Sequence, residues 1–173
     1  KEQAGMTNPG IRGDIRYGLR WGAPLAVVVL ILDQITKWIA RDNLWHPPIR
    51  VEVVSFLDFV PVENRGVSFG LFQSEGSTGV WLISVFAIIV AAGLSIWMYS
   101  VRRRWPALAL GLVIGGAIGN VIDRLHLSWV VDFIDFHIST WHWPAFNIAD
   151  AAIVIGVGML LIDGLFGPAK KPK

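Results

Sequence analysis

Four apolar stretches, each long enough to cross a lipid bilayer as a helix, constrain this chain more than any other feature of its sequence. A membrane-spanning helix needs about 20 largely apolar residues. Stretches of this kind run over residues 23–40, 80–98, 105–122 and 145–166. Only 16% of the residues are charged, whereas soluble domains average about 25%. The sequence therefore predicts an all-α membrane protein, a four-transmembrane-helix bundle that forms a single domain over residues 1–173.

The basic residues indicate how these spans are oriented. Of the fifteen Lys and Arg residues, four lie in the N-terminal tail (1–20), three in the Arg102–Arg104 connection and three in the C-terminal tail (167–173). Four spans place both termini on one side, and the positive-inside rule makes that side cytoplasmic. We therefore expect both tails in the cytoplasm and segments 41–79 and 123–144 on the opposite side. The net charge of +2 is too small to favour nucleic acid binding.

The segment 41–79 is less apolar than the spans and contains turn residues. Val51 to Val62 is rich in β-branched and aromatic residues, which indicates one or two strands. A turn signal at Asn64–Gly66 is followed by a predicted return strand at Val67–Phe72. Open sheet edges are excluded from hydrocarbon, so we expect a small extracytoplasmic β-sheet on the membrane surface. Segment 123–144 carries Trp residues typical of the membrane interface and is predicted to be a connection.

Polar residues collect around the ends of the last two apolar stretches. Asn120, Asp123 and Arg124 have i, i+3, i+4 spacing, so one face of a helix presents all three. Asn147 and Asp150 are also three residues apart and share a face at the start of the fourth span. Two roles stay open for Asn120, Asp123 and Arg124. One is a role in function; the other is to form ion pairs that only fix the end of the helix, which would need the same residue types.

Two aspartates stand out because their neighbours are apolar. Asp150 is followed by Ala-Ala-Ile-Val-Ile, and a charge at the centre of a membrane helix costs about 2.5–3.5 kcal/mol. Asp132 lies between Val130-Val131 and Phe133-Ile134, a poor setting for a solvated charge. If the connection folds back toward the bundle, the two carboxylates can face each other, and one then keeps a proton. Such a pair can act as general base and general acid, as in aspartic proteases.

Other patterns carry less weight. Residues 66–70 match the letters of G-x-S-x-G, but that motif needs a strand–turn–helix in an α/β-hydrolase sheet. The histidines and Asp135 raise the question of a metal site, but no H-E-x-x-H is present, and interfacial histidines are the preferred interpretation. These histidines are His46, His126, His137 and His142. Gly115 and Gly119 form a small-xxx-small pair, for which helix packing is the preferred role. Cys is absent, which excludes disulfides and Cys-based metal sites.

Five short motifs occur in order along the chain. They are Asp33-Gln34-Ile35-Thr36-Lys37, Asn64-Arg65-Gly66-Val67-Ser68-Phe69, GGAIGNVIDR over Gly115–Arg124, Val130-Val131-Asp132-Phe133, and Phe146-Asn147-Ile148-Ala149-Asp150. With these motifs the chain resembles bacterial lipoprotein signal peptidase, also called signal peptidase II, over residues 20–166. No single motif would be specific, but five in this order are.

The resemblance implies a four-helix aspartyl endopeptidase of the bacterial inner membrane. Such an enzyme removes the signal peptide from prolipoproteins by cleaving just before a Cys that carries a diacylglyceryl group. By motif, the catalytic pair falls on Asp132 and Asp150. The resemblance also implies supporting or substrate-binding roles for Asn120, Asp123, Arg124, Asn147, Asn64 and Gly66, and a structural role for Asp33. It implies inhibition by the cyclic peptide antibiotic globomycin.

The mechanism expected from these assignments uses a water molecule held between the two aspartates, and it needs no metal or organic cofactor. The expected partners are lipid-modified prolipoproteins, which enter laterally from the bilayer, together with membrane lipids and inhibitors such as globomycin. A monomer is expected. Two other classes of protein stay open, namely a small proton-coupled transporter with buried carboxylates and a structural subunit of a larger complex. The acids cluster near one face of the membrane, which favours an active site over a channel, and Asp135 has no assigned role.

Overall fold

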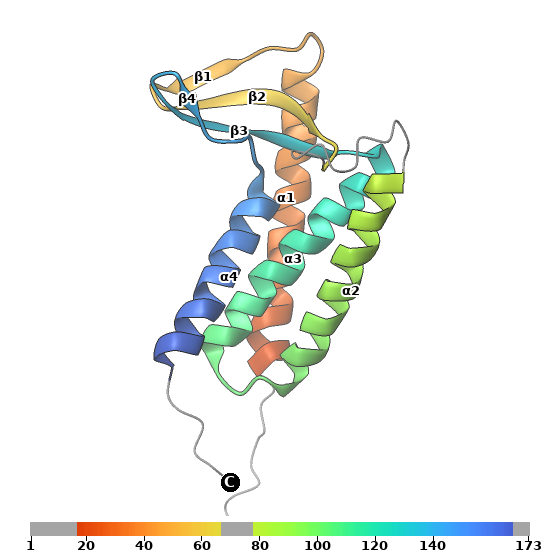
Figure 1. Cartoon of the computed structure of the whole chain (residues 1–173), viewed down its shortest axis with the longest axis vertical. Helices are drawn as coiled ribbons and strands as arrows, with labels where there is room; N and C mark the ends of the chain where they lie inside the picture. The colour runs from red at the N-terminus through yellow and green to blue at the C-terminus, as the bar shows by residue number, and fades with distance from the viewer. Residues whose placement is uncertain (1–16, 67–77, 168–173) are drawn as a thin grey trace, which may run out of the picture.

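The computed structural model of the chain describes residues 17–66 and 78–167. The helices are η2 (Gly18–Gly22, a π-helical turn), α1 (Ala23–Leu44), α2 (Thr78–Ser100), α3 (Arg104–Leu127) and α4 (Ile148–Phe166). The strands are β1 (Val51–Val54), β2 (Leu57–Asn64), β3 (Val130–Ile138) and β4 (Trp141–His142). Figure 1 shows the helices side by side in a bundle and the strands across one end of it.

Four helices within the described residues are long and apolar enough to cross a membrane, which confirms the predicted architecture. Their boundaries differ from the prediction at several helix ends; for example, α1 ends at Leu44 and not at residue 40. α3 continues past residue 122 to Leu127, so Asp123 and Arg124 are helical. η2 extends the first span back to Gly18, within the predicted N-terminal tail. Tyr17, just before this extension, packs against the buried core cluster that contains Met98 and Leu110.

α3 is the central helix of the bundle. In its most apolar window 67% of the residues are buried, against 17–22% in the other three spans. Glycines allow this close packing. A Cβ on Gly115 would overlap the carbonyl oxygen of Ala26 in α1, and a Cβ on Gly116 would overlap that of Ala149 in α4. The backbones therefore approach as they do at small-xxx-small contacts, and the packing role predicted for Gly115 is confirmed.

The outer surfaces of the bundle are apolar. Large side chains such as Phe86 and Ile96 on α2 and Leu165 on α4 are mostly exposed. A water-soluble monomer rarely exposes contiguous apolar surface of this extent. These side chains instead suit contact with lipid, and the chain is a multi-pass membrane protein.

A four-stranded antiparallel sheet in the order β1-β2-β3-β4 lies across the end of the bundle (Figure 1). β1 falls within the predicted strand region, and β2 overlaps it but continues to Asn64, two residues past its end. The predicted return strand at Val67–Phe72 lies outside the described residues. The partner of β2 is β3, so the prediction that segment 123–144 is only a connection was wrong. Asp132 and Asp135 interrupt the β-branched and aromatic run of β3, which weakens the strand signal in the sequence.

The pairing of β3 brings distant segments of the chain together. On one edge, β2 pairs with β3 in a register that puts Asn64 opposite Val130. On the other side, Ile134 and Phe146 exchange backbone hydrogen bonds of 2.9 and 3.0 Å just before α4 begins. β3 therefore lies between the surface segment and the start of α4, and it carries Asp132 into that position.

Gly156 and Gly158 of α4 provide a matched test of the helix packing. A Cβ on Gly156 would lie 2.7 Å from both the carbonyl oxygen of Ala109 and Cγ2 of Val113, whereas one on Gly158 meets no atom within 4 Å. Gly156→Ala should lower the free energy of unfolding by about 1–3 kcal/mol, the usual range for overpacking. Gly158→Ala should leave it unchanged or raise it. Thermal unfolding of both variants in detergent measures the difference, and equal stability would contradict the close contact between α3 and α4.

Candidate active site

The predicted site residues come from five elements that meet where the bundle joins the sheet (Figure 1). They are Asp33 on α1, Asn64 at the end of β2, Asn120, Asp123 and Arg124 on α3, Asp132 on β3, and Asn147 and Asp150 at the start of α4. Hydrogen bonds and ion pairs connect nearly all of these side chains into one network.

Asn147, the N-cap of α4, links the two aspartates. Its Oδ1 accepts a hydrogen bond from the Asp150 N–H at 3.0 Å, and Asp150 Oδ2 accepts one from the Asn147 N–H at 3.2 Å, which forms a capping box. Its Nδ2 donates to Asp132 Oδ1 at 2.7 Å. The same amide group also donates to Asn120 Oδ1 and the Val131 carbonyl, both at 3.2 Å. Because Asn147 is fully buried, it holds both carboxylates in fixed positions.

Asp132 is 1% exposed and has hydrogen bonds to both carboxylate oxygens. Asn147 donates to Oδ1, and Asn64 Nδ2 donates to Oδ2 at 2.8 Å. Asn64 is itself held by the Gly66 N–H, which donates to its Oδ1 at 2.8 Å. Gly66 has a φ of +82°, a backbone conformation that favours glycine. Asn64 and Gly66 therefore act as a turn that positions Asp132.

Asp150 lies in the first turn of α4 and is more exposed than Asp132. Its Oδ1 accepts a hydrogen bond from Asn120 Nδ2 at 2.8 Å. Asn120 Oδ1 in turn accepts from Lys37 Nζ at 2.9 Å and from Asn147. The side-chain amide of Asn120 and the backbone N–H of Asn147 therefore orient the Asp150 carboxylate. A group held in this way is pre-organised for chemistry.

Lys37 is the residue that sequence reasoning missed. It is 2% exposed, and its Nζ lies 2.9 Å from Asp33 Oδ2 and 3.0 Å from Asp123 Oδ2. Asp33 Oδ1 accepts a hydrogen bond from the Ala149 N–H at 3.0 Å, at the start of α4. The signal in the sequence was the i, i+4 spacing of Asp33 and Lys37 within an apolar stretch, which places opposite charges on one helix face.

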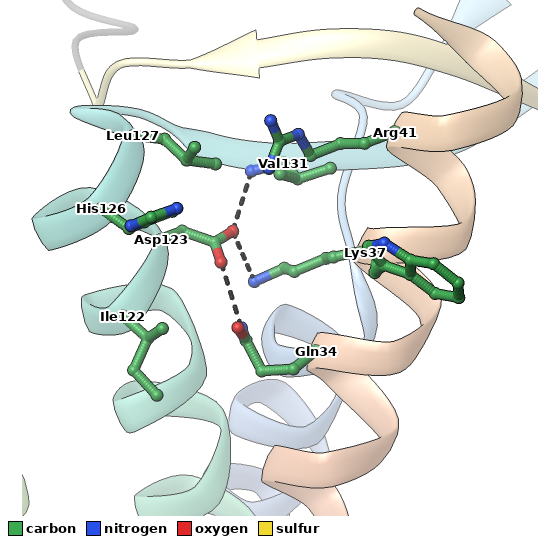
Figure 2. Close-up of a pocket in the computed structure, with 9 residues that line it drawn as sticks. Gln34, Lys37, Arg41, Ile122, Asp123, His126, Leu127 and Val131 are labelled. Carbon is green, nitrogen blue, oxygen red and sulfur yellow. Dashed lines mark hydrogen bonds and ion pairs between the residues drawn. The ribbon is translucent and has the colours of Figure 1, made fainter.

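Asp123 connects three elements. Figure 2 shows its carboxylate pointing from α3 toward Gln34 and Lys37 of α1 and toward the backbone of Val131 in β3. Gln34 Nε2 donates to Asp123 Oδ1 and the Val131 N–H donates to Oδ2, both at 3.0 Å. These residues border a pocket of about 160 Å³ between α1 and α3, whose rim includes Arg41. Through its hydrogen bond from Val131, Asp123 supports β3. Neither Asp132 nor Asp150 borders this pocket.

Arg124 lies on α3 beside the network. Its guanidinium interacts electrostatically with Asp150, Asp132 and Asp123. Nη1 donates to the Asn120 carbonyl at 3.4 Å, and the buried Nε has no hydrogen-bond partner among the described residues. A buried donor without a partner is unfavourable, so this guanidinium is available to another group.

The electrostatics of Asp132 reflect its surroundings. Burial, and after it the nearby charge of Asp150, raises the pKa of the Asp132 carboxyl to about 6. The hydrogen bonds from Asn64 and Asn147 act in the opposite sense without overcoming burial. Two carboxylates in one low-dielectric site do not both ionise readily. The arrangement can therefore hold one proton and one negative charge, as general acid–base catalysis requires.

A multi-pass membrane protein with two linked aspartates at one end of a helix bundle is the class that this fold and site define. Comparison with known proteins gives the family. The model of the family described as Signal peptidase (SPase) II matches residues 25–166. The chain therefore belongs to the signal peptidase II family and is a membrane protease.

Individual relatives agree with this assignment. The lipoprotein signal peptidase of Methylobacterium radiotolerans is 45% identical over 89% of this chain and 91% of its own length. That of Aeromonas hydrophila is 42% identical over 90% of this chain and 94% of its own length. A solved bacterial membrane enzyme is 30% identical, with a TM-score of 0.75 over 90% of this chain and 96% of that chain. The predicted family is confirmed, and the transporter alternative finds no support.

The buried ion pairs of Lys37 provide a stability test. Lys37→Met leaves Asp33 and Asp123 buried without their cation, and breaking a buried pair in this way costs about 3–5 kcal/mol. Arg65→Gln is the matched control, because Arg65 and Glu63 form an exposed pair whose contribution is about 0–1 kcal/mol. Thermal unfolding in detergent should show a large loss for the first variant and little for the second. Similar losses would contradict the central role of Lys37.

The raised pKa of Asp132 predicts a pH dependence of stability. The folded protein binds this proton more tightly than the unfolded chain, so the stabilising contribution is present below about pH 4 and lost as the pH rises through about 6. Relative to Asp132→Asn, the wild type should lose roughly 3 kcal/mol between about pH 4 and 7, because one pKa unit corresponds to about 1.36 kcal/mol. Asp42→Asn, at an exposed position on α1, is the control. A difference between wild type and Asp132→Asn that does not vary with pH would refute the assignment.

Proposed function

We propose that this chain cleaves the signal peptide from lipid-modified prolipoproteins just before the lipidated Cys, with Asp132 and Asp150 as the catalytic pair. The observation that carries the assignment is that one buried residue, Asn147, hydrogen-bonds to both carboxylates: its side-chain amide donates to Asp132, and its backbone N–H donates to Asp150. Two aspartates so linked can share one proton, which divides the roles of acid and base between them.

The proposed reaction uses one water molecule as the nucleophile. Asp150 takes a proton from this water while the water oxygen attacks the scissile carbonyl carbon, which gives a tetrahedral intermediate with one hydroxyl group and one negatively charged oxygen. Asp132, in its protonated form, then donates to the amide nitrogen as the C–N bond breaks. The proton on Asp150 returns to Asp132 when the products leave, so the pair is regenerated. The steps need no metal or organic cofactor.

Arg124 and the polar residues around the aspartates have supporting roles in this proposal. The unpartnered Nε of Arg124 suits a carbonyl oxygen of the substrate backbone, which would satisfy a buried donor. Asn64 and Gly66 form the edge of the site on the side of the surface segment. Asn120, Asn147 and the ion pairs of Lys37 keep the carboxylates in position.

The substrate enters from the bilayer in this proposal, because its signal helix and its acyl chains both partition there. Exposed apolar side chains on and between β1 and β2, including Val51, Val53 and Phe56, suit contact with lipid or with the acyl chains at the membrane surface. The exposed basic connection Arg102–Arg104 lies at the opposite end of the bundle from the sheet (Figure 1). The positive-inside rule then supports cytoplasmic termini and an active site near the periplasmic face of a bacterial inner membrane. The chain acts as a monomer, and globomycin blocks the aspartate pair.

The catalytic assignment predicts the behaviour of two variants. Asp132→Asn and Asp150→Asn should each reduce the cleavage of a diacylglyceryl-modified prolipoprotein to below about one thousandth of the wild-type rate, because each removes one half of an acid–base pair that acts as a unit. Incubation of purified protein with substrate, followed by a gel shift, measures cleavage. Asp42→Asn should cleave at the wild-type rate.

Two further arms make this experiment decisive. An unlipidated prolipoprotein should remain uncut by the wild type, whereas equal cleavage of both forms would contradict recognition of the lipid. Each Asn variant should insert in the membrane and elute from gel filtration like the wild type. Substantial processing by a correctly inserted Asp132→Asn or Asp150→Asn protein would instead favour a structural role for these aspartates.

A further inference from the structure

Three ligand-type side chains gather on the sheet, away from the aspartate network. Among residues 17–66 and 78–167, Asp135, His137 and His142 form a group in which one ligand atom of each residue lies within 4.8 Å of the others. The sequence alone favours separate interfacial histidines and assigns no role to Asp135. The structure instead brings two of the four histidines to that aspartate.

Strand pairing explains why these residues meet. Asp135 and His137 are two residues apart on β3, so their side chains point to the same face of the sheet. His142 on β4 is the cross-strand partner of His137, and the two imidazole rings stack with centroids 5.0 Å apart. His142 Nδ1 lies 2.9 Å from Asp135 Oδ2. The group is therefore fixed by backbone register and not by flexible loops.

A fourth potential ligand faces the same group from β2. Asp58 is the cross-strand partner of Asp135, and its side chain is 3% exposed. Its Oδ1 is buried without a hydrogen-bond partner, as is Nδ1 of His137, which lies 3.9 Å from Asp58 Oδ2. Buried polar atoms without partners are rare in native structures, and a bound ion or water is one way in which they are satisfied.

The charges on this face point to a cation. Two carboxylates directly opposite each other on neighbouring strands repel, and the strands hold both Asp58 and Asp135 in buried positions. Arg50 partly compensates, because its guanidinium contacts Asp58 and lies 3.5 Å from Asp135. That side chain is 51% exposed, so it can swing away when another cation binds.

We propose that Asp135, His137 and His142 bind a divalent transition-metal ion such as Zn²⁺, with Asp58 as the fourth ligand in place of its contact with Arg50. Imidazole nitrogens and carboxylate oxygens are the ligands that Zn²⁺ takes in tetrahedral sites, at about 2.0–2.2 Å. The donor atoms lie close enough to reach such an ion through small side-chain rotations, which the 41% exposure of His142 allows. Binding would satisfy the unpartnered atoms of Asp58 and His137.

Such an ion would join three strands of the sheet. β4 contains only Trp141 and His142, and a ligand on it would fix this short strand to β3. β3 also carries Asp132, three residues before Asp135, on the opposite face of the strand. The bound ion would therefore stiffen the sheet that presents Asp132, without entering the reaction.

The first test is metal binding by the purified full chain in detergent, without any histidine tag. Isothermal titration with Zn²⁺ should show saturable binding of one ion per chain and a higher thermal unfolding temperature. His137→Ala and His142→Ala should each weaken binding by more than about tenfold, since loss of even an outer-shell partner has an effect of this size. His126→Ala is the matched control, because His126 is exposed and borders the separate pocket between α1 and α3, and it should bind Zn²⁺ like the wild type.

The second test separates a metal site from a simple ion-pair cluster. Arg50→Gln removes the competing cation and should tighten Zn²⁺ binding, whereas it should lower stability if Arg50 is the cation that the cluster is built for. Absence of saturable Zn²⁺ binding by both the wild type and Arg50→Gln overturns the proposal. So does a His137→Ala protein that binds Zn²⁺ as tightly as His126→Ala does. Signal peptide cleavage is not used as a readout, so failure here leaves the proposed function untouched.

Discussion

The rest of the site depends on the interactions of the buried ammonium group of Lys37. This group forms ion pairs with Asp33 and Asp123 and donates a hydrogen bond to Asn120. Each of these three acceptors makes a further contact with another element. Asp33 accepts from the start of α4, Asp123 accepts from β3, and the amide of Asn120 donates to Asp150. Removing the cation would leave two buried carboxylates unpaired, which is far less favourable than losing an exposed ion pair.

The membrane explains why so much of this site rests on polar side chains. Between helices in a bilayer there is little hydrophobic driving force, so association depends on close packing and on hydrogen bonds. α3 satisfies the first requirement with glycines against α1 and α4. The second is met at one end of the bundle, where Gly119 leaves room for the carboxylate of Asp33 between α1, α3 and α4. The same glycine face therefore serves both helix packing and the placement of a buried ion pair.

Sequence reasoning predicted the parts of this structure that depend on local composition. Each membrane span is a long apolar stretch, and the site residues could be recognised because polar residues are rare beside such stretches. It failed where placement depends on tertiary contacts. β3 was missed because Asp132 and Asp135 interrupt its apolar pattern, and both are tolerated only because partners from β2, α4 and β4 bind them. The role of Lys37 was missed for a similar reason, since an i, i+4 pair with Asp33 does not reveal the third charge, Asp123, on another helix.

The two aspartates differ in their backbone settings, and this difference supports distinct roles. Asp150 is the third residue of α4, where the unpaired N–H groups and the dipole of the helix stabilise negative charge. It also closes the capping box with Asn147. Asp132 lies on a strand, has no helix N-terminus to stabilise its charge, and is more deeply buried. In the proposed mechanism a shared proton is therefore better placed on Asp132, with Asp150 as the base. Because Asn147 hydrogen-bonds to both carboxylates, the placement of the two aspartates relative to each other depends on the position of the α4 N-terminus.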